Sequence, residues 1–324
     1  MTQGLPDRLR IATRGSALAR WQADHVASLL RSAHHGLVVD LVVIDTLGDR
    51  ALDQPIWELG GQGVFVKEVQ AAVLDGRADV AVHSAKDLPS SPSLCPAGLS
   101  ISAVPERADA RDALVGLPLD LIPSGGVVAT GSTRRRAQLA DLRPDLTFTG
   151  LRGNIDTRLA LVATVSAVVM AVAALDRLGR RHEVAEVLAP AVMVPQVGQG
   201  ALAAECRVDD EASAALLATI EHQPSRRAVE AERGFLATLG GGCELPAGAY
   251  AVEEPDGRLW LRAVLATLDG RIVLRDEAIG ERHEEPSALG RHLGEHLLEA
   301  GGGRALLADA GALTLGMPGP KSSR

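Results

Sequence analysis

Short runs of apolar residues alternate with helical patterns over the first two-thirds of the chain. Apolar runs of this length are typical of buried strands, whereas apolar positions three and four residues apart predict helices. In the first unit, strands are predicted at 9–14, 37–45 and 78–84, with a helix capped by Ser16 and another over 64–75. The first helix presents one apolar face, which comprises Leu18, Trp21, Val26 and Leu29. This β-α-β-α-β order predicts a mainly parallel sheet with helices on both faces.

A second unit of the same kind begins near residue 107. Its predicted strands are 126–130, 146–151 and 166–172, and its predicted helices are 132–142 and 154–162. The Pro/Gly-containing segment 194–201 is expected to lead the chain back to the first unit. Two wound units joined in this way favour a cleft between them, with ligand bound where strands lead into helices.

The pattern changes near residue 222 to a helix at 224–239, hairpin-like strands within 257–279 and a closing helix at 286–300. We therefore predict an α/β protein of two wound lobes with a cleft between them, plus a small α+β C-terminal domain. The expected boundaries are 1–105 with 200–220 for lobe 1, 106–199 for lobe 2, 221–315 for the C-terminal domain and 316–324 for a disordered tail.

Composition excludes several other classes of protein. A net charge of −8 and an aromatic content of 2% argue against nucleic-acid binding. The N-terminus lacks the apolar region of a secretory signal, and the three cysteines are far apart, so a reducing, cytoplasmic location is expected. The uncharged segment 159–175 is short for a membrane span and is better explained as a helix end followed by a buried strand.

Loops that follow the predicted strands combine Ser, Thr or Gly at helix starts with basic residues. Free N–H groups at a helix start favour anions, and Arg and Lys donate hydrogen bonds to carboxylate or phosphate. Neither a Walker motif nor a GxGxxG fingerprint is present, so a ligand with several carboxylates fits these loops best. The alternative for each individual arginine is a salt bridge at the surface. The residues concerned are Arg14, Ser16, Ser84, Lys86, Thr130, Ser132, Arg134, Arg135, Arg152 and Arg158.

Two further residues are candidates for chemistry. Asp87 is an acid in a basic loop, where it either stabilises a cation or transfers a proton, or forms a salt bridge with Lys86 or Arg14. Cys243 follows three glycines, which expose the thiol and allow another molecule to approach it. An attachment point for a covalent group is the favoured interpretation, because no histidine is placed by the sequence to serve a thiol hydrolase.

The segment 292–296 matches the H-x-x-E-H pattern of inverted zinc proteases. A glycine at its centre suits a rigid metal site poorly, and we expect a solvated helix face and no metal.

Seven stretches together resemble the porphobilinogen deaminase (hydroxymethylbilane synthase) family, in family order and over nearly the whole chain. They are RIATRGSALA (10–19), GGQGVFVKE (60–68), ADVAVHSAKDLP (78–89), TGSTRRRAQL (130–139), LRGNIDTRL (151–159), VGQGALAAECR (197–207) and LGGGCELPAGAY (239–250). The sequence departs from the family at Gln62, where many members have lysine, at Asp176, and in a shorter segment 159–167.

The resemblance implies a transferase that joins four porphobilinogen molecules into the linear tetrapyrrole hydroxymethylbilane and releases ammonia. It implies a dipyrromethane cofactor on Cys243 through a thioether, catalysis by Asp87, two lobes similar to periplasmic binding proteins, and a monomer whose product passes to uroporphyrinogen-III synthase. The implied cofactor-binding residues are Ser84, Lys86, Thr130, Ser132, Arg134 and Arg135. The implied substrate-binding residues are Arg14, Ser16, Lys67, Arg152, Arg158 and Arg177. The alternative is a non-catalytic binder of polycarboxylates, which would not need Cys243.

Overall fold

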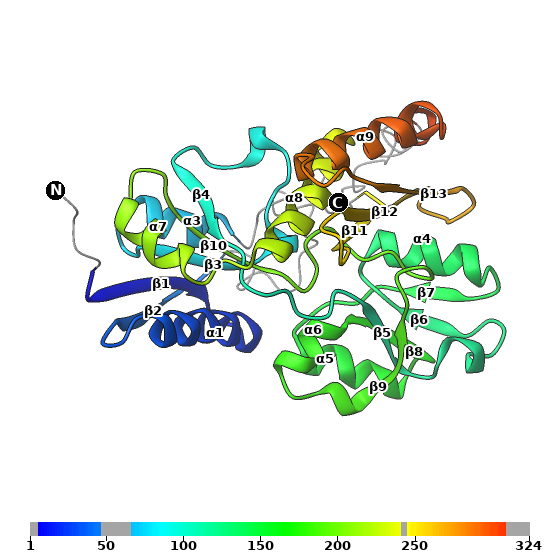
Figure 1. Cartoon of the computed structure of the whole chain (residues 1–324). Coiled ribbons are helices and arrows are strands. Elements are labelled where there is room, and N and C mark those ends of the chain that lie inside the picture. Colours follow the sequence, from blue (N-terminus) through cyan, green and yellow to red (C-terminus); the bar gives the residue numbers. More distant parts are fainter. Residues whose placement is uncertain (1–5, 47–65, 241–244, 309–324) are drawn as a thin grey trace, which may run out of the picture.

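The computed structural model describes residues 6–46, 66–240 and 245–308, which form three sheets with their covering helices (Figure 1). In the first lobe the strand order is β2-β1-β3-β10-β4. Because β10 is antiparallel to both β3 and β4 while β1 is parallel to β2 and β3, four strands share one direction. The elements of this lobe are β1 (Arg8–Arg14), α1 (Ala17–Ala33), β2 (Val38–Ile44), α3 (Lys67–Leu74), β3 (Val80–Ser84), β4 (Leu99–Ala103), β10 (Leu202–Arg207) and α7 (Glu211–Ala218).

The second lobe repeats this plan with the strand order β7-β6-β8-β5-β9. Here β6 is parallel to β7 and β8, and β5 is the strand that runs antiparallel to its neighbours β8 and β9. Its elements are β5 (Asp112–Gly116), β6 (Val127–Ala129), α4 (Thr133–Leu142), β7 (Thr147–Thr149), α5 (Ile155–Ala160), β8 (Ala167–Ala171), α6 (Val172–Arg177) and β9 (Val184–Leu188).

The third unit is an antiparallel sheet covered by two helices. Its strands follow one another in the order β11-β12-β13, and α8 packs against both the sheet and α9. The elements are α8 (Gln223–Thr238), β11 (Ala247–Glu253), β12 (Leu259–Ala266), β13 (Val273–Ile279) and α9 (Pro286–Glu299). The predicted fold class, two wound α/β lobes with a small α+β unit, is therefore confirmed.

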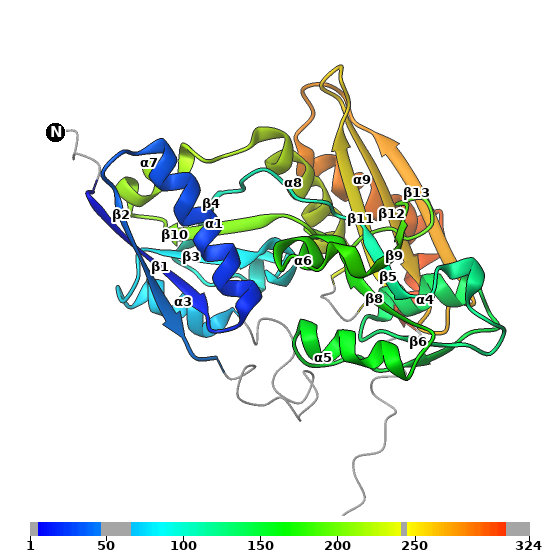
Figure 2. The same cartoon turned by 90° about the horizontal axis from the view of Figure 1, so that it is seen from below.

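Local sequence explains the helix that begins the first lobe. Ser16 caps α1, because its hydroxyl accepts a hydrogen bond from the backbone N–H of Ala19 at 3.3 Å. The helix buries Ala23, Val26 and Leu30 completely against the sheet. Trp21 lies at the edge of this face and stays half-exposed. Figure 2 shows α1 beside α6, and contacts between these helices cross from one lobe to the other.

The segment 159–175 is distributed over several short elements. It contains the end of α5, the 3-10 turn Leu161–Ala163, the buried strand β8 and the start of α6. Among the described helices, none has the length and apolar character needed to cross a bilayer.

One buried carboxylate connects all three units. Glu232, on α8, is fully buried and pairs with Arg107, which lies on the segment between β4 and β5, at 2.6 Å. The same carboxylate accepts hydrogen bonds from the backbone N–H groups of Gly198, on the return segment, and Ala251, on β11. Every one of these bonds joins a different part of the chain to α8, so Glu232 holds the junction together.

We predict that Glu232→Gln destabilises the protein by about 3–5 kcal/mol, because it removes the charge that compensates buried Arg107. Denaturant unfolding measures the loss. The matched control is Glu277→Gln, which breaks an exposed pair with Arg262 on β12 and β13 and is expected to cost less than about 1 kcal/mol. Equal losses in the two variants would contradict the role of Glu232.

Candidate functional site

Six of the residues singled out in the sequence line one cavity between the two lobes. Its wall includes Arg14, Ser16, Ser84, Lys86, Asp87 and Arg177. The first five come from the first lobe, Arg177 comes from the second, and Gln199 and Gly200 of the return segment complete the wall. The cavity therefore lies where the pattern of two wound units placed a cleft.

Strand direction explains why distant residues meet here. Arg14 ends β1 and Ser84 ends β3, and these strands are parallel neighbours, so both residues lie at the same edge of the sheet. The 3-10 turn Ala85–Asp87 follows directly and carries Lys86 and Asp87 into the cavity wall. Ser16 does two things, because it lines the cavity and caps α1.

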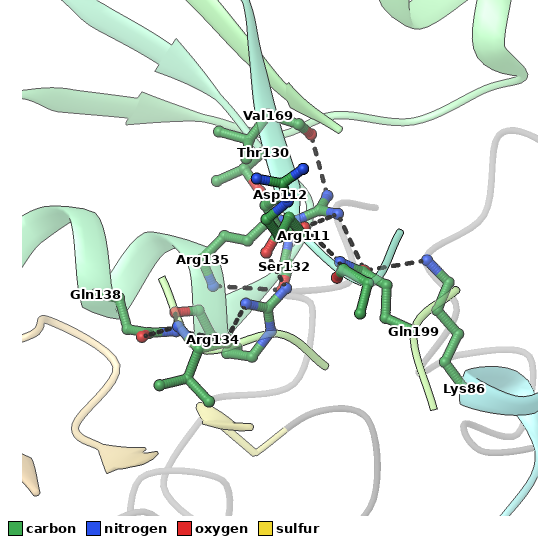
Figure 3. A network of polar contacts seen from close by, with 12 residues as sticks. Lys86, Arg111, Asp112, Thr130, Ser132, Arg134, Arg135, Gln138, Val169 and Gln199 are labelled. Carbon is green, nitrogen blue, oxygen red and sulfur yellow. Dashed lines mark hydrogen bonds and ion pairs between the residues drawn. The ribbon is translucent and has the colours of Figure 1, made fainter. Parts of the chain in front are cut away.

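Beside the cavity, two adjacent arginines share one buried carboxylate (Figure 3). Arg134 and Arg135, at the start of α4, are 2% and 8% exposed and pair with Asp112 at 2.8 and 2.7 Å. Burial raises the pKa of Asp112, but the two guanidinium groups outweigh it and hold the pKa at about 2. Ser132 caps this helix, and Thr130 accepts a hydrogen bond from the backbone N–H of Ser132. Both arginines are therefore held rigidly by the second lobe.

Gln199 is a residue of the cavity wall that the sequence did not single out. Its fully buried side chain donates to Asp112 at 2.8 Å and to the carbonyl of Ala110 at 2.7 Å, and its oxygen lies 3.5 Å from Nζ of Lys86. Figure 3 shows it between Lys86 and the Asp112 pair. Gln199 thus connects the turn of the first lobe to the charged cluster of the second.

The sequence feature that could have identified Gln199 is the pair of glycines on either side of it. Gly198 and Gly200 have φ values of +70° and +86°, which other residues rarely adopt. A Cβ on Gly198 would lie 2.9 Å from the carbonyl carbon of Ala85, and one on Gly200 would lie 2.5 Å from the carbonyl oxygen of Ala108. The glycines let the return segment approach the turn Ala85–Asp87 closely enough for Gln199 to reach Lys86.

The cavity is electropositive. The pKa of Lys86 is lowered to about 8, chiefly by burial and also by Arg135 and Arg158, while Asp87 acts in the opposite direction. Burial also lowers the pKa of Arg158, as does Arg135, while Asp87 raises it. Asp87 thus interacts electrostatically with Lys86 of the first lobe and with Arg158 of the second. The charges of Lys86, Arg135 and Arg158 also act on one another across the cleft.

Arg177 adds a guanidinium from the end of α6. It is 9% exposed and donates a hydrogen bond to the carbonyl of Gly200 at 2.7 Å. Burial lowers its pKa to about 10, while neighbouring Asp176 acts to raise it. Within the described part of the chain, Nε of Arg177 and Nε of Arg134 are buried without a hydrogen-bond partner. Donors of this kind suit an anionic ligand.

Two of the singled-out residues, Lys67 and Arg152, lie away from the cavity wall. Lys67 is exposed at the start of α3, Arg152 is exposed before α5, and neither is among the residues that line the cavity. Cys243 and Gln62 lie outside the described residues.

No group of three or more potential metal ligands gathers within the ranges that the structure describes. His292 pairs with Glu284 at 3.4 Å and His296 with Asp276 at 2.6 Å, all at the surface around α9. A separate depression of about 470 Å³ between the first lobe and α8 is lined by residues that include Glu221, Arg226 and Glu230. Arg226 pairs there with Glu221 at 2.7 Å, so this depression lacks the surplus of cations found at the cavity.

Comparison with known families gives two adjacent matches. Residues 9–215 match the family described as "porphobilinogen deaminase, dipyromethane cofactor binding domain". Residues 226–299 match the family described as "porphobilinogen deaminase, C-terminal domain". The two matches follow each other along the chain and include all the described residues that line the cavity.

Solved structures give weaker likenesses. The methionine binding protein MetQ is 13% identical over 66% of this chain and 90% of its own, with a TM-score of 0.41. A putative lipoprotein from Ruminococcus gnavus is 10% identical over 73% of this chain and 98% of its own, with a TM-score of 0.41. The BvgS periplasmic domain of B. pertussis is 16% identical over 66% of this chain, with a TM-score of 0.37, and the match spans 40% of the BvgS chain.

We predict that Asp112→Asn destabilises the protein by about 3–5 kcal/mol at pH 7, because two buried guanidinium groups lose their counter-charge. The folded pKa of Asp112, about 2, lies below its ordinary value of 3.8. Its contribution is therefore complete above about pH 4 and is lost as the pH falls through 2. Denaturant unfolding of the wild type and of Asp112→Asn between pH 7 and pH 2 measures this effect: the difference between their free energies of unfolding is expected to shrink as the pH falls.

Asp145→Asn is the matched control for this experiment. Hydrogen bonding to Arg143 lowers the pKa of Asp145 to about 2 as well, but that pair is exposed. A much smaller loss is expected, since solvent screens the pair. Wild-type stability of Asp112→Asn at pH 7 would show that the arginines do not depend on Asp112.

Proposed function

Because this chain belongs to the porphobilinogen deaminase family, we propose that its reaction takes place in the cavity between the lobes, with Asp87 as the catalytic residue and Cys243 as the tether of the cofactor. The protein polymerises porphobilinogen into hydroxymethylbilane with release of ammonia and uses a dipyrromethane cofactor. The observation that supports this placement is that Asp87 lines the same cavity as Arg14, Lys86 and Arg177.

The charges of the cavity fit the substrate. Each porphobilinogen carries an acetate and a propionate, so a growing chain gains two carboxylates per unit and needs a cation or several N–H donors for each. Arg14, Lys86 and Arg177 line the cavity, and Arg158 lies close enough to influence Asp87 and Arg135. We assign substrate binding to Arg14, Ser16, Lys67, Arg152, Arg158 and Arg177.

The second lobe and the turn before Asp87 fit the cofactor. Its carboxylates would meet Lys86, Arg134 and Arg135, with hydrogen bonds from Ser84, Thr130 and Ser132. The buried Nε of Arg134, which has no partner among the described residues, supports this assignment. When bound, the cofactor supplies a pyrrole carbon that attacks the next substrate. Gln199 and Asp112 fix the orientation of the groups that hold it.

Asp87 acts on the positive charge that develops in the substrate. When the C–N bond breaks, the amino group leaves with a proton as ammonia, and the remaining ring carries a positive charge. A carboxylate held opposite that ring stabilises the charge, and the pyrrole carbon that attacks loses its proton as the new C–C bond forms. The surrounding cations bind carboxylates and so orient the two rings for attack.

Several finer expectations extend this proposal. We propose that the protein is hydroxymethylbilane synthase, a cytoplasmic monomer that delivers its product to uroporphyrinogen-III synthase. We also propose domain boundaries at 1–105 with 200–220, 106–199 and 221–315. The alternative of a non-catalytic binder of polycarboxylates is disfavoured by the two family matches.

We predict that the purified protein carries an adduct on Cys243 whose mass equals two porphobilinogen units less two ammonia. Intact-mass measurement followed by peptide mapping locates it. Cys243→Ser is expected to lack the adduct and Cys95→Ser, at an exposed cysteine, to keep it. A folded, active wild-type protein with an unmodified Cys243 would overturn the assignment of the tether.

We predict that Asp87→Asn lowers turnover of porphobilinogen by at least about 100-fold, because the amide cannot stabilise the developing cation. The rate of ammonia release measures turnover, and the thermal midpoint, expected within a few degrees of wild type, monitors folding. Asp75→Asn, at an exposed pair with Arg77 after α3, serves as the control and is expected to keep full activity. Near-wild-type turnover in Asp87→Asn would remove Asp87 from the mechanism.

A further inference from the structure

Arg177 has an aromatic contact that connects the two lobes. Its guanidinium carbon lies 5.5 Å from the centre of the Trp21 ring. Trp21 belongs to α1 of the first lobe, whereas Arg177 ends α6 of the second. An arginine within about 6 Å of an indole face is attracted to the ring quadrupole, and the attraction grows when water is excluded.

Arg177 is anchored differently from the other buried arginines of the site. Arg134 and Arg135 are fixed by the carboxylate of Asp112, which binds both. The neighbouring acid Asp176 pairs with Arg181 at 3.1 Å, and the hydrogen bond of Arg177 goes to the carbonyl of Gly200. Within the described ranges this carbonyl is the acceptor found for Arg177, and one neutral acceptor does not set the orientation of a planar guanidinium group. The Trp21 ring is therefore a second constraint on its position.

The Trp21 ring is itself held in place. His25 lies one helical turn later on α1, and its ring stacks on Trp21 with centroids 5.0 Å apart and an angle of 9° between the planes. Burial lowers the pKa of His25, and the charge of Arg177 lowers it further, so the imidazole is neutral at neutral pH. A neutral ring stacks on Trp21 without competing with Arg177 for the electron-rich indole face.

We propose that Trp21 is a positioning residue for Arg177: the indole face holds the guanidinium in the cavity wall, where a substrate carboxylate can accept hydrogen bonds from its N–H groups. This inference rests on the proposed role of Arg177 in substrate binding. Two observations support it, the contact between lobes and the buried Nε without a partner among the described residues. Loss of the indole leaves Arg177 present but poorly oriented, which weakens substrate binding more than the chemical step.

The chain offers a matched control for the loss of an arginine–tryptophan contact. Arg262 lies over the ring of Trp260 at 4.9 Å, within β12 of the C-terminal sheet. Trp260 is half-exposed, as Trp21 is, and neither Trp260 nor Arg262 lines the cavity. The two contacts therefore differ in their position relative to the site.

The experiment measures KM for porphobilinogen, kcat and the thermal midpoint in cofactor-loaded enzyme. Trp21→Leu is expected to raise KM about fivefold to tenfold with kcat within about twofold of wild type. Trp21→Phe, which keeps a ring face, is expected to restore most of the loss and guards against misfolding of the leucine variant. Trp260→Leu is expected to leave KM unchanged. In an Arg177→Ala background, Trp21→Leu is expected to have no further effect on KM.

The outcomes separate this inference from the function on which it depends. A raised KM in Arg177→Ala with a wild-type KM in Trp21→Leu overturns the positioning role alone, and so does an effect of Trp21→Leu that persists without Arg177. A wild-type KM in Arg177→Ala overturns the assignment of Arg177 and the inference with it. Absence of porphobilinogen turnover in the wild-type enzyme overturns the function itself.

Discussion

The charged site depends on the ion pairs between buried Asp112 and two arginines, Arg134 and Arg135. Two guanidinium groups that are almost wholly buried would be too costly to keep charged without a counter-ion, because their hydration is lost. Asp112 supplies that counter-ion from the first residue of β5, directly after the segment that connects the lobes. Its bond to Gln199 also brings in the return segment, so both connections between the lobes meet at one carboxylate.

Glu232 compensates a further cation of the junction, Arg107, and accepts hydrogen bonds from the backbone on either side. Asp112 offsets one of the two charges of Arg134 and Arg135. One positive charge of that pair therefore remains, together with the cations that line the cavity, to interact with a ligand. Cations fixed in this way can bind the carboxylates of a ligand without reorganising, whereas a developing positive charge can be stabilised only by an acid such as Asp87 in the same wall.

The local features were predictable from the sequence, and the long-range polar contacts were not. Ser16 and Ser132 cap their helices as expected, and the strand–helix rhythm predicted the order of the parallel strands and their helices in each lobe. The antiparallel strands β5 and β10 escaped prediction, since LAAECR and DALVG are short runs that contain acidic residues. Arg134 and Arg135 were expected to bind a ligand, but nothing in hydrophobic periodicity identifies Asp112, more than twenty residues away, as their partner. Gln199 was missed for the same reason.

Lys86 shows how the site balances stability against binding. Its folded pKa of about 8 lies below its ordinary value of 10.5, so the folded state disfavours the charged amine. The cost is fully present below pH 8 and is relieved as the pH rises from 8 towards 10.5, because the unfolded chain then binds more protons. A carboxylate placed beside Lys86 reverses the effect of burial and raises that pKa, so binding and protonation favour each other. We infer that keeping buried Lys86 charged lowers the stability of the folded protein and that a carboxylate-bearing ligand offsets this cost. The free energy lost at Lys86 on folding is then recovered when the ligand binds, which increases the affinity of the site.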